Sequence, residues 1–257
     1  MNNRIQMAFA NGKAFIPFIT GGDPDLETTE KLVREMEAAG ADLIEIGIPF
    51  SDPIAEGPVI QAASERALRQ GTTVDKLFDL VRKLRKIVKI PLIFMGYANS
   101  VFGYGAEKFF EKCSQTGVDG LILPDIPFEE RDEFLDLSKK YQVFLISMVA
   151  PTSSQRVRTI AREAEGFLYC VSSLGVTGVR EELNQQISGI VKQAKEVSNI
   201  PCAVGFGIST PEQARQMAEF SDGVIVCSAI VKLVEAKGRD CVPAVKTYVE
   251  EMKKALK

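Results

Sequence analysis

Short apolar runs alternate with longer amphipathic segments along the whole chain. The apolar runs mix aliphatic and aromatic residues with few polar ones, as parallel strands covered on both faces do. The predicted strands lie near 14–19, 42–48, 90–95, 119–123, 143–149, 167–171, 201–206 and 223–227. The longer segments repeat apolar positions at helical spacing, and they predict helices near 26–38, 58–70, 73–88, 105–116, 129–140, 153–163, 181–198, 211–219, 229–237 and 240–256.

Eight β–α units without a linker-like stretch predict a (β/α)8 TIM barrel, a single domain over 1–257 with extra helices. A doubly wound nucleotide fold would carry Gly-x-Gly-x-x-Gly after its first strand, whereas residues 20–24 read Thr-Gly-Gly-Asp-Pro. The widest spacing separates the second and third strands, and it includes an extended loop at 51–58. Such a loop at the C-terminal end of a barrel strand is where this fold builds active sites.

The composition of the chain excludes several classes of protein and kinds of catalytic site. The chain has 257 residues, of which 46% are hydrophobic and 25% charged, so it can bury a sizeable core. A net charge of −3 argues against general binding to nucleic acid, and no apolar run is long enough to span a membrane. The sequence has no histidine, which excludes Ser–His triads and His-ligated metal sites. Five widely spaced cysteines and no signal-like N-terminus predict reduced thiols and a cytoplasmic location.

Glu45 is the first candidate catalytic residue. Within the predicted strand 42–48 every second side chain shares a face, and one face carries only isoleucines, at 44, 46 and 48. That face suits packing against helices, so Glu45 should point into the barrel. A carboxyl there must be paired, neutral or used, and desolvation would raise its pKa toward that of a general acid–base. The alternative is a structural glutamate bonded to backbone amides at the barrel rim.

Other acids are open to two interpretations. Glu56 lies in the extended loop just beyond Glu45, where it is either a second site carboxylate or a solvated loop acid. Asp125 follows a strand end and could act in the site, stabilise the rim or contact a partner. Asp23 and Asp52 stand beside prolines, as turn acids do.

Glycine-rich turns predict a phosphate site. Residues 205–209 read Gly-Phe-Gly-Ile-Ser before a helix, and 227–229 lead directly into another, after the seventh and eighth strands. Helix N-termini and exposed backbone N–H groups at these strands form the usual phosphate cradle of this fold. No lysine ends a predicted strand, which argues against a Schiff-base aldolase. The remaining chemistry is carboxylate acid–base work on a phosphorylated substrate that carries its own electron sink.

In order along the chain, the motifs resemble those of the tryptophan synthase alpha subunit family. The most specific is Leu-Ile-Glu-Ile-Gly-Ile-Pro-Phe-Ser-Asp-Pro-Ile-Ala-Glu-Gly-Pro at 43–58. The others lie at 17–24, 95–99, 124–127, 172–178, 205–209 and 228–231. The resemblance implies retro-aldol cleavage of indole-3-glycerol phosphate to indole and glyceraldehyde 3-phosphate.

The resemblance also assigns roles to residues. Glu45 matches the principal acid–base, Glu56 the carboxylate that stabilises the indole N–H, and Tyr169 a residue that assists Glu45 near the reacting carbon. Gly178, Gly207 and Ser228 match phosphate-binding positions, and Thr177 matches a lid residue that contacts the second acid. Phe18, Tyr97 and Phe206 match the walls of the indole pocket. The alternative for all three is ordinary core packing.

The family's alpha subunits pair with a beta subunit, and the resemblance implies an alpha2beta2 hetero-tetramer. Pro49, Asp52, Ile54 and Pro127 match the docking surface. No cofactor is expected in this chain, because pyridoxal phosphate belongs to the beta subunit, and no nucleic acid or membrane partner is expected.

Three positions depart from the family pattern. Glu56 stands where aspartate is common, Cys227 where glycine is common, and Ser173 where arginine is frequent. Three rival functions stay open: a lyase without a partner, a non-catalytic barrel that only activates a partner, its chemistry weakened by Glu56, and another phosphosugar enzyme such as an isomerase.

Overall fold

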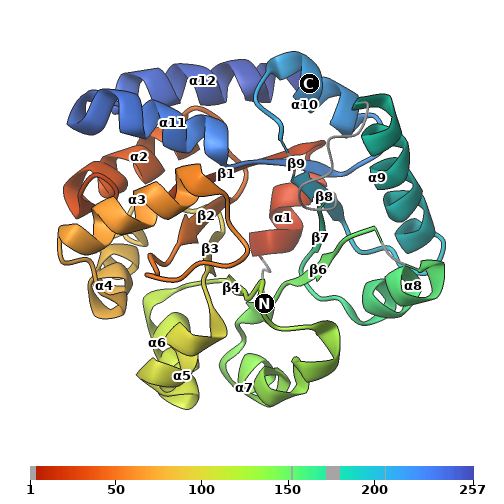
Figure 1. Cartoon of the computed structure of the whole chain (residues 1–257), viewed down its shortest axis with the longest axis horizontal. Helices are drawn as coiled ribbons and strands as arrows, with labels where there is room; N and C mark the ends of the chain where they lie inside the picture. The colour runs from red at the N-terminus through yellow and green to blue at the C-terminus, as the bar shows by residue number, and fades with distance from the viewer. Residues whose placement is uncertain (1–3, 152, 172–179, 206) are drawn as a thin grey trace.

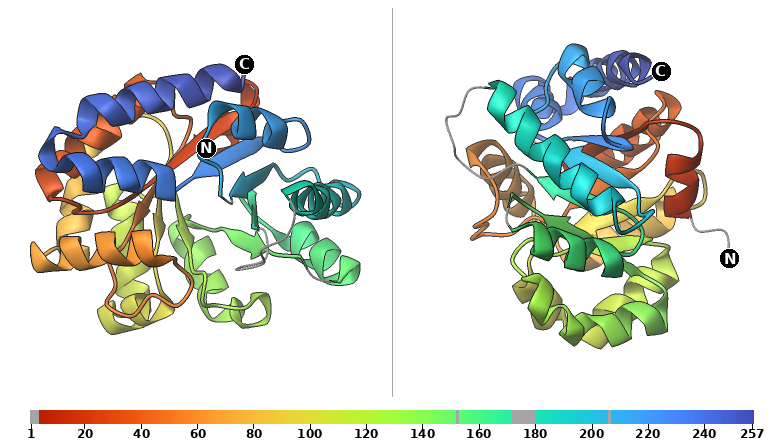
Figure 2. Two further views of the ribbon diagram at one scale, coloured as in Figure 1. Left: turned by 45° about the horizontal axis from the view of Figure 1, so that its top comes forward. Right: turned by 90° about the vertical axis from the view of Figure 1, so that its right-hand side faces the viewer.

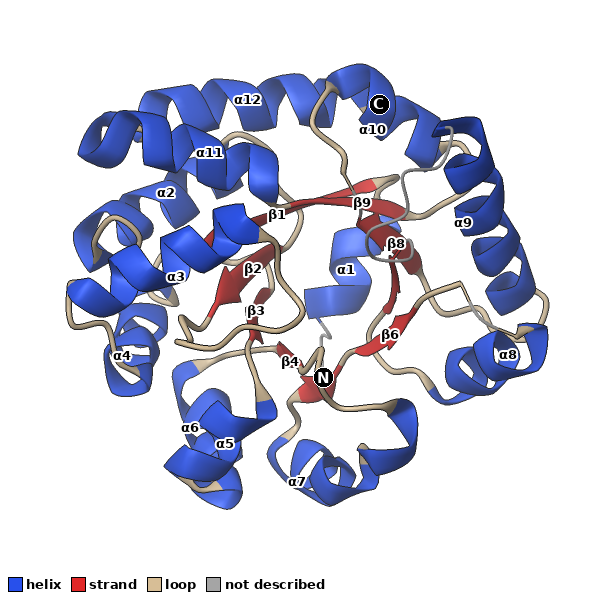
Figure 3. Cartoon of the chain, in the orientation of Figure 1, coloured by secondary structure: helices blue, strands red, loops and turns tan. Residues whose placement is uncertain are grey.

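Parallel strands form a barrel surrounded by helices (Figures 1 and 3). The structure is a computed structural model that describes residues 4–151, 153–171, 180–205 and 207–257. For residues 180–184 it describes the backbone only. Within these residues the sheet has nine strands in the order β5-β4-β3-β2-β1-β9-β8-β7-β6. Their bounds are β1 Ala14–Thr20, β2 Ile44–Gly47, β3 Leu92–Met95, β4 Gly120–Ile122, β5 Phe144–Leu145, β6 Ser147–Val149, β7 Leu168–Val171, β8 Cys202–Gly205 and β9 Gly223–Val226. The predicted (β/α)8 TIM barrel is confirmed.

The predicted fifth strand, 143–149, is divided in two. β5 pairs with β4, whereas β6 pairs with β7, so the chain changes neighbours at Ile146. The Ile146 N–H still donates to Leu121 O at 2.9 Å. Because the two outermost strands of the sheet follow each other directly in sequence, the chain itself closes the barrel wall.

Helices cover the outside of the barrel. The helices that follow strands are α2 Leu26–Ala38, α3 Pro58–Arg69, α4 Val74–Leu84, α5 Ala98–Tyr104, α6 Ala106–Thr116, α7 Asp132–Tyr141, α8 Ser154–Glu163, α9 Arg180–Lys195, α10 Pro211–Ala218, α11 Ser228–Lys237 and α12 Val242–Ala255, with 3-10 turns η1 Phe128–Glu130 and η2 Gly238–Asp240. α5 is not among the predicted helices; it precedes α6 and is separated from it by Gly105 at φ +90°. No helix among the described residues is long and apolar enough to cross a membrane.

A second missed helix, α1 (Arg4–Ala10), lies at the end of the barrel opposite the loop that follows β2 (Figure 2). Its Ile5 is fully buried and packs with the interior residues Ala14 and Phe167. The ring of Phe9 packs at a tilt against that of Phe167, with ring centroids 5.6 Å apart. The helix thus closes the end at which the strands begin.

Side chains alternate between two apolar regions. Ile44, Ile46 and Ile48 pack in the outer region between strands and helices, as their spacing predicted. Leu43 and Ile93 pack in the barrel interior. β2 ends at Gly47 and α3 begins at Pro58, so residues 48–57 form the predicted extended loop. This loop lies at the C-terminal ends of the strands.

Candidate active site

Glu45 points into the barrel from the middle of β2. Its neighbours across the sheet are Phe18 on β1 and Ile93 on β3. The residue is fully buried, and neither carboxyl oxygen has a hydrogen-bond partner among the described residues. Burial raises the pKa of Glu45 to about 8. The alternative of a structural glutamate bonded to backbone amides is therefore wrong, and at neutral pH the side chain is a neutral acid.

Glu56 lies in the loop after β2 and is partly buried. Burial raises the pKa of Glu56 to about 7, although the hydroxyl of Tyr97, which donates to its carboxylate, lowers it. The same hydroxyl accepts the Ala55 N–H at 3.0 Å. Tyr97 is itself held by stacking on Phe50, with ring centroids 5.2 Å apart. Glu56 is therefore partly shielded from water rather than a freely solvated loop acid.

Tyr169 rises from β7 and lies over a glycine of the neighbouring strand. A Cβ added at Gly205 would stand 2.5 Å from the Tyr169 hydroxyl, so the ring needs that glycine. On the other side of the barrel, a Cβ at Gly47 would stand 2.6 Å from Cζ of Phe18. Two strand glycines therefore make room for the rings of Tyr169 and of Phe18, which is the neighbour of Glu45 on β1. The sequence analysis did not assign this role to either glycine.

Tyr169 and Cys227 influence each other's ionisation. Burial raises the pKa of Tyr169 well above its usual value, and the charges at Cys227 and Glu45 add to the rise. Burial likewise raises the pKa of the Cys227 thiol, and the charges of Glu45 and Glu56 also raise it. Cys227 is thus electrostatically coupled to both candidate acids.

The helix starts after β8 and β9 differ in what they offer an anion. α10 uses its own side chains, because Thr210 and Gln213 form a reciprocal capping box. α11 begins at exposed Ser228, and its N-cap residue Cys227 makes no side-chain hydrogen bond to the helix. Backbone N–H groups at the start of α11 are therefore available to a phosphate. Gly207 is exposed at φ +56°, and a Cβ there would meet nothing within 4 Å.

Some predicted positions lie outside the described residues. They are Ser173, Thr177, Gly178 and Phe206.

Three other acids have structural partners. Both carboxyl oxygens of Asp125 accept the Ala98 N–H at 3.1 Å, which caps the start of α5. Buried Asp23 forms an ion pair with Arg66, at 2.8 Å from Nε, and so ties the loop after β1 to α3. Asp52 is exposed. The structure favours the rim interpretation of Asp125 over a catalytic one.

The predicted docking residues lie at the same end of the barrel as the two acids. Ile54 is 81% exposed, and Asp52 and Pro127 are also exposed, whereas Pro49 is buried. The sequence analysis missed Phe102 on α5, an aromatic residue that is 50% exposed. The sequence feature that could have predicted it is the short apolar segment directly after the third predicted strand.

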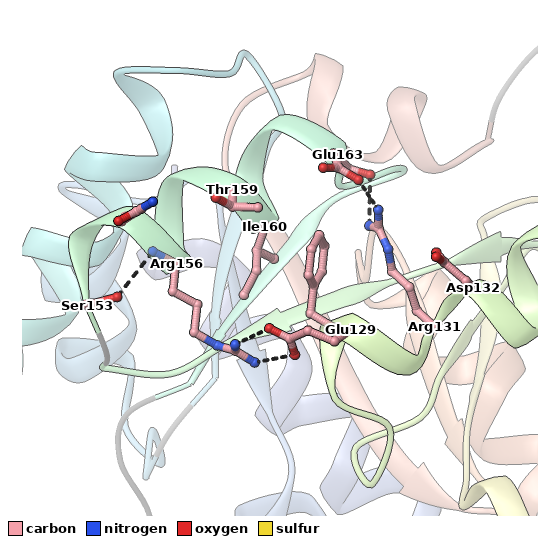
Figure 4. Close-up of a pocket in the computed structure, with 10 residues that line it drawn as sticks. Glu129, Arg131, Asp132, Ser153, Arg156, Thr159, Ile160 and Glu163 are labelled. Carbon is pink, nitrogen blue, oxygen red and sulfur yellow. Dashed lines mark hydrogen bonds and ion pairs between the residues drawn. The ribbon is translucent and has the colours of Figure 1, made fainter.

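A separate hollow of about 450 Å³ lies on the outer wall between η1 and α8 (Figure 4). Four of its charged side chains pair with one another, Arg156 with Glu129 and Arg131 with Glu163. None of the candidate catalytic residues lines it. Among the described residues, no three cysteine, aspartate or glutamate side chains come together in a way that could hold a metal ion.

Comparisons with known proteins agree with this geometry. A family model described as tryptophan synthase alpha chain matches residues 5–257. The tryptophan synthase alpha chain of Thermoanaerobacter sp. (strain X514) is 47% identical over 247 residues, covering 95% of this chain and 94% of that protein. The crystal structure of the alpha chain from Legionella pneumophila subsp. pneumophila superposes with a TM-score of 0.89 at 38% identity, covering 100% of this chain and 98% of that one. A chain of tryptophan synthase from M. tuberculosis, in its aminoacrylate-bound form, gives a TM-score of 0.88 at 30% identity, covering 99% and 100%.

Proposed function

Because the chain belongs to the tryptophan synthase alpha chain family, we propose that it cleaves indole-3-glycerol phosphate to indole and glyceraldehyde 3-phosphate. The observation that supports this most is the buried, unpartnered carboxyl of Glu45 inside the barrel. Burial keeps that carboxyl protonated at neutral pH, as a general acid must be. A retro-aldol reaction that uses a protonated indole ring as its electron sink requires such an acid.

In the first step, Glu45 donates its proton to C3 of the indole ring. The ring then carries a positive charge that is centred on its nitrogen, and the carboxylate of Glu56 accepts the N–H hydrogen bond and stabilises the charge. The Tyr97 hydroxyl favours the ionised form of that carboxylate, because it lowers the pKa of Glu56.

In the second step, the bond between C3 and the glycerol carbon breaks and its electron pair returns to the ring, which leaves as indole. The carboxylate of Glu45 takes the proton of the neighbouring hydroxyl, which becomes the aldehyde of glyceraldehyde 3-phosphate. Glu45 ends protonated, so the cycle balances without a cofactor in this chain. Tyr169 assists at the reacting carbon. The charge of Glu45 contributes to its raised pKa.

The two ends of the substrate would bind different elements. The phosphate would take backbone N–H groups at the start of α11, with Ser228, Gly207 and Gly178 around it. The indole would lie between the aromatic residues Phe18, Tyr97 and Phe206. Thr177 would contact Glu56 when the site closes.

The test is indole release from indole-3-glycerol phosphate by the isolated chain. Glu45→Gln should lower kcat by about two to four orders of magnitude, because the amide cannot donate and retake the proton. Asp125→Asn is the matched control, since an amide oxygen can still cap α5, and it should stay within about tenfold of wild type. An unmodified chain that forms no indole, or a Glu45→Gln variant as fast as the control, would overturn the proposal.

The partner is the second part of the proposal. We infer that the C-terminal end of the barrel docks a beta subunit, in an alpha2beta2 assembly, through Asp52, Ile54 and Pro127, with Pro49 beneath them. Exposed apolar side chains at this end support it. Pyridoxal phosphate would reside in the partner. Adding a beta subunit should raise the cleavage rate; an unchanged rate would favour a lyase that works alone.

We also place the reaction in the cytoplasm. The five cysteines are all unpaired, and four of them are buried, which suits a reducing compartment.

A further inference from the structure

Glu56 lies in a loop segment, residues 53–57, that belongs to no helix or strand. The backbone N–H and C=O groups of this segment therefore lack the partners that a helix or a sheet would supply. Two side chains from outside the segment bond to its backbone: Gln61 of α3, and Tyr97, the N-cap residue of α5. The direction in which the Glu56 carboxylate points depends on such contacts.

Gln61 binds the segment at two carbonyl groups. Its side-chain nitrogen Nε2 donates to the carbonyl oxygen of Glu56 at 2.8 Å. The same nitrogen donates to the carbonyl oxygen of Pro53 at 3.4 Å, which is a longer and weaker bond. An amide NH2 group has two hydrogens, so it can serve both acceptors. One side chain thus ties the beginning of the segment to the residue that provides the carboxylate.

The place of Gln61 in α3 explains how its amide reaches the loop. α3 begins at Pro58, and the backbone N–H of Gln61 donates to Gly57 O at 3.1 Å in the first turn. Long side chains on a helix point back toward its N-terminus. The amide of Gln61 therefore lies on the side from which the loop enters the helix.

α3 is anchored to the barrel along its length. Ile60 packs with Phe18 of β1. Arg66 forms two hydrogen bonds, of 2.8 and 2.9 Å, with buried Asp23 in the loop after β1, and a third of 2.9 Å with Glu235 of α11. The amide that holds the loop therefore extends from a helix that is fixed to β1, to the loop after β1 and to α11.

Tyr97 and Gln61 hold the segment on opposite sides of Glu56. The Tyr97 hydroxyl accepts the Ala55 N–H at 3.0 Å, which fixes the backbone just before Glu56. Gln61 binds the carbonyl group that follows the Glu56 side chain. With both sides held, the backbone that carries the carboxylate has little freedom to turn.

We propose that Gln61 is a positioning residue, whose amide holds the backbone of Glu56 so that the carboxylate faces the indole N–H. The inference rests on the proposed function for the role of Glu56. Gln61 binds backbone carbonyls rather than substrate, so it acts through Glu56. Its side chain is exposed, so little of the fold's stability depends on it.

The first experiment measures cleavage of indole-3-glycerol phosphate. Gln61→Ala removes the donor, and Gln61→Glu removes it with almost no change of shape. Each should lower kcat about tenfold, because the carboxylate then spends less time in the productive position. The dissociation constant of glycerol 3-phosphate, which probes the phosphate end of the site, should stay within about twofold of wild type. Gln61→Lys, whose ammonium can still donate to both carbonyls, should keep kcat within about threefold.

The same helix provides the matched control. Gln70 is the exposed C-cap residue of α3, about 13 Å from Gln61 along the helix axis. Gln70→Ala and Gln70→Glu make the same chemical changes away from the loop. Both should leave kcat unchanged.

The second experiment asks whether Gln61 acts through Glu56. Glu56→Ala removes the carboxylate that Gln61 is proposed to aim. Adding Gln61→Ala to this variant should therefore lower kcat by less than about twofold, whereas the same change costs about tenfold in the wild-type chain.

The third experiment needs no substrate. Hydrogen exchange of the Ala55 N–H, followed by NMR, should be at least about fivefold faster in Gln61→Ala, since the segment then has one anchor instead of two. Tyr97→Phe, which removes the acceptor of that N–H, gives the upper limit. The midpoint of thermal unfolding should stay within about 2 °C of wild type.

The outcomes separate this inference from the proposed function. A wild-type kcat in Gln61→Ala, an equal loss in the Glu56→Ala background, or unchanged exchange at Ala55 would each overturn the positioning role. A lower kcat that comes with a large drop in unfolding temperature would assign Gln61 to the fold instead, which also overturns it. A chain that releases no indole would overturn the proposed function, while exchange at Ala55 would still decide whether Gln61 holds the loop.

Discussion

Glu45 and Glu56 have the same side chain but different surroundings in the barrel. Burial raises the pKa of fully buried Glu45 to about 8. Burial raises the pKa of Glu56 to about 7, and the hydrogen bond from Tyr97 limits the rise. At a pH between these two pKa values, most molecules have Glu45 protonated and Glu56 ionised. The proposed mechanism requires this protonation state.

The pH profile of kcat/KM should therefore be bell-shaped, with its maximum between about pH 7 and 8. Below this range Glu56 gains a proton and can no longer stabilise the positive ring, and above it Glu45 loses the proton it must donate. Initial rates of indole release, measured at low substrate concentration from about pH 5.5 to about pH 9.5, check both limbs. An activity that stays constant up to the highest pH would contradict the assignment of Glu45 as the acid.

The buried carboxyl should also lower stability as the pH rises. Glu45 keeps its proton in the folded chain up to about pH 8, whereas an unfolded chain loses it near its ordinary value. Folding then takes up a proton, so stability falls with pH across this window, by at most about 1.4 kcal/mol per pH unit.

Glu45→Met removes this effect and fills the same space. Its stability relative to wild type should increase by about 2–3 kcal/mol between about pH 5.5 and about pH 7.5, measured by urea unfolding. Glu133→Met, on the exposed side of α7, should give the same difference at both pH values. A Glu45→Met gain that does not grow with pH would show that the carboxyl is not held neutral.

At the scale of elements, α1 is the clearest example of a helix that tertiary packing forms. It has only seven residues, which is too short to be stable alone. Its fully buried Ile5 packs into the barrel interior, and Met7 on the other side is 57% exposed. The helix is also tied to the barrel by Arg4, whose guanidinium is 2.7 Å from Asp119.

Ile5→Ala should therefore destabilise the chain by about 2–5 kcal/mol, through lost burial and the cavity left behind. Met7→Ala, in the same helix but facing water, should change stability by less than about 0.5 kcal/mol. Urea unfolding of both variants measures the difference. Equal effects would mean that α1 does not close the barrel as a packed element.

The sequence predicted the elements with strong periodicity and missed those that depend on the assembled barrel. Alternating strands and helices, and the inward direction of Glu45, follow from local spacing. α1 and α5 are too short to show a helical period, and each is fixed by distant groups such as the Asp125 carboxylate. The change of partners at Ile146 has no local signal, because it depends on which strands meet when the barrel closes. The packing of Tyr169 over Gly205 likewise needs the order of the strands in space.

The whole molecule has two ends with different tasks. At the end where the strands begin, α1 packs on the interior, and Arg85 donates to Gly117 O at 2.7 Å and pairs with Asp119. At the other end lie the two acids, the start of α11 and the exposed loops. This division agrees with barrels in which the C-terminal face carries function and the opposite face carries stability.

Exposed apolar side chains at the functional end follow strands that are neighbours in the sheet. Ile54 follows β2, Phe102 follows β3 and Pro127 follows β4, so the three belong to adjacent loops. Phe102 also contacts buried Phe134, with ring centroids 5.2 Å apart, which holds it in position. Adjacent apolar groups on a fixed support are the kind of surface that a partner protein buries.

Phe102→Ser should therefore weaken binding of the beta subunit by about ten- to a hundredfold, the cost of leaving one large apolar contact unmade. Ile87→Ser is the matched control: Ile87 is also 50% exposed, but it precedes β3 and lies at the end that α1 closes. Titrating each variant into the beta subunit by calorimetry gives the two dissociation constants, and thermal unfolding shows whether the loss at Phe134 affects folding. If both substitutions weaken binding equally, or neither does, the partner does not dock on the loops that surround the two acids.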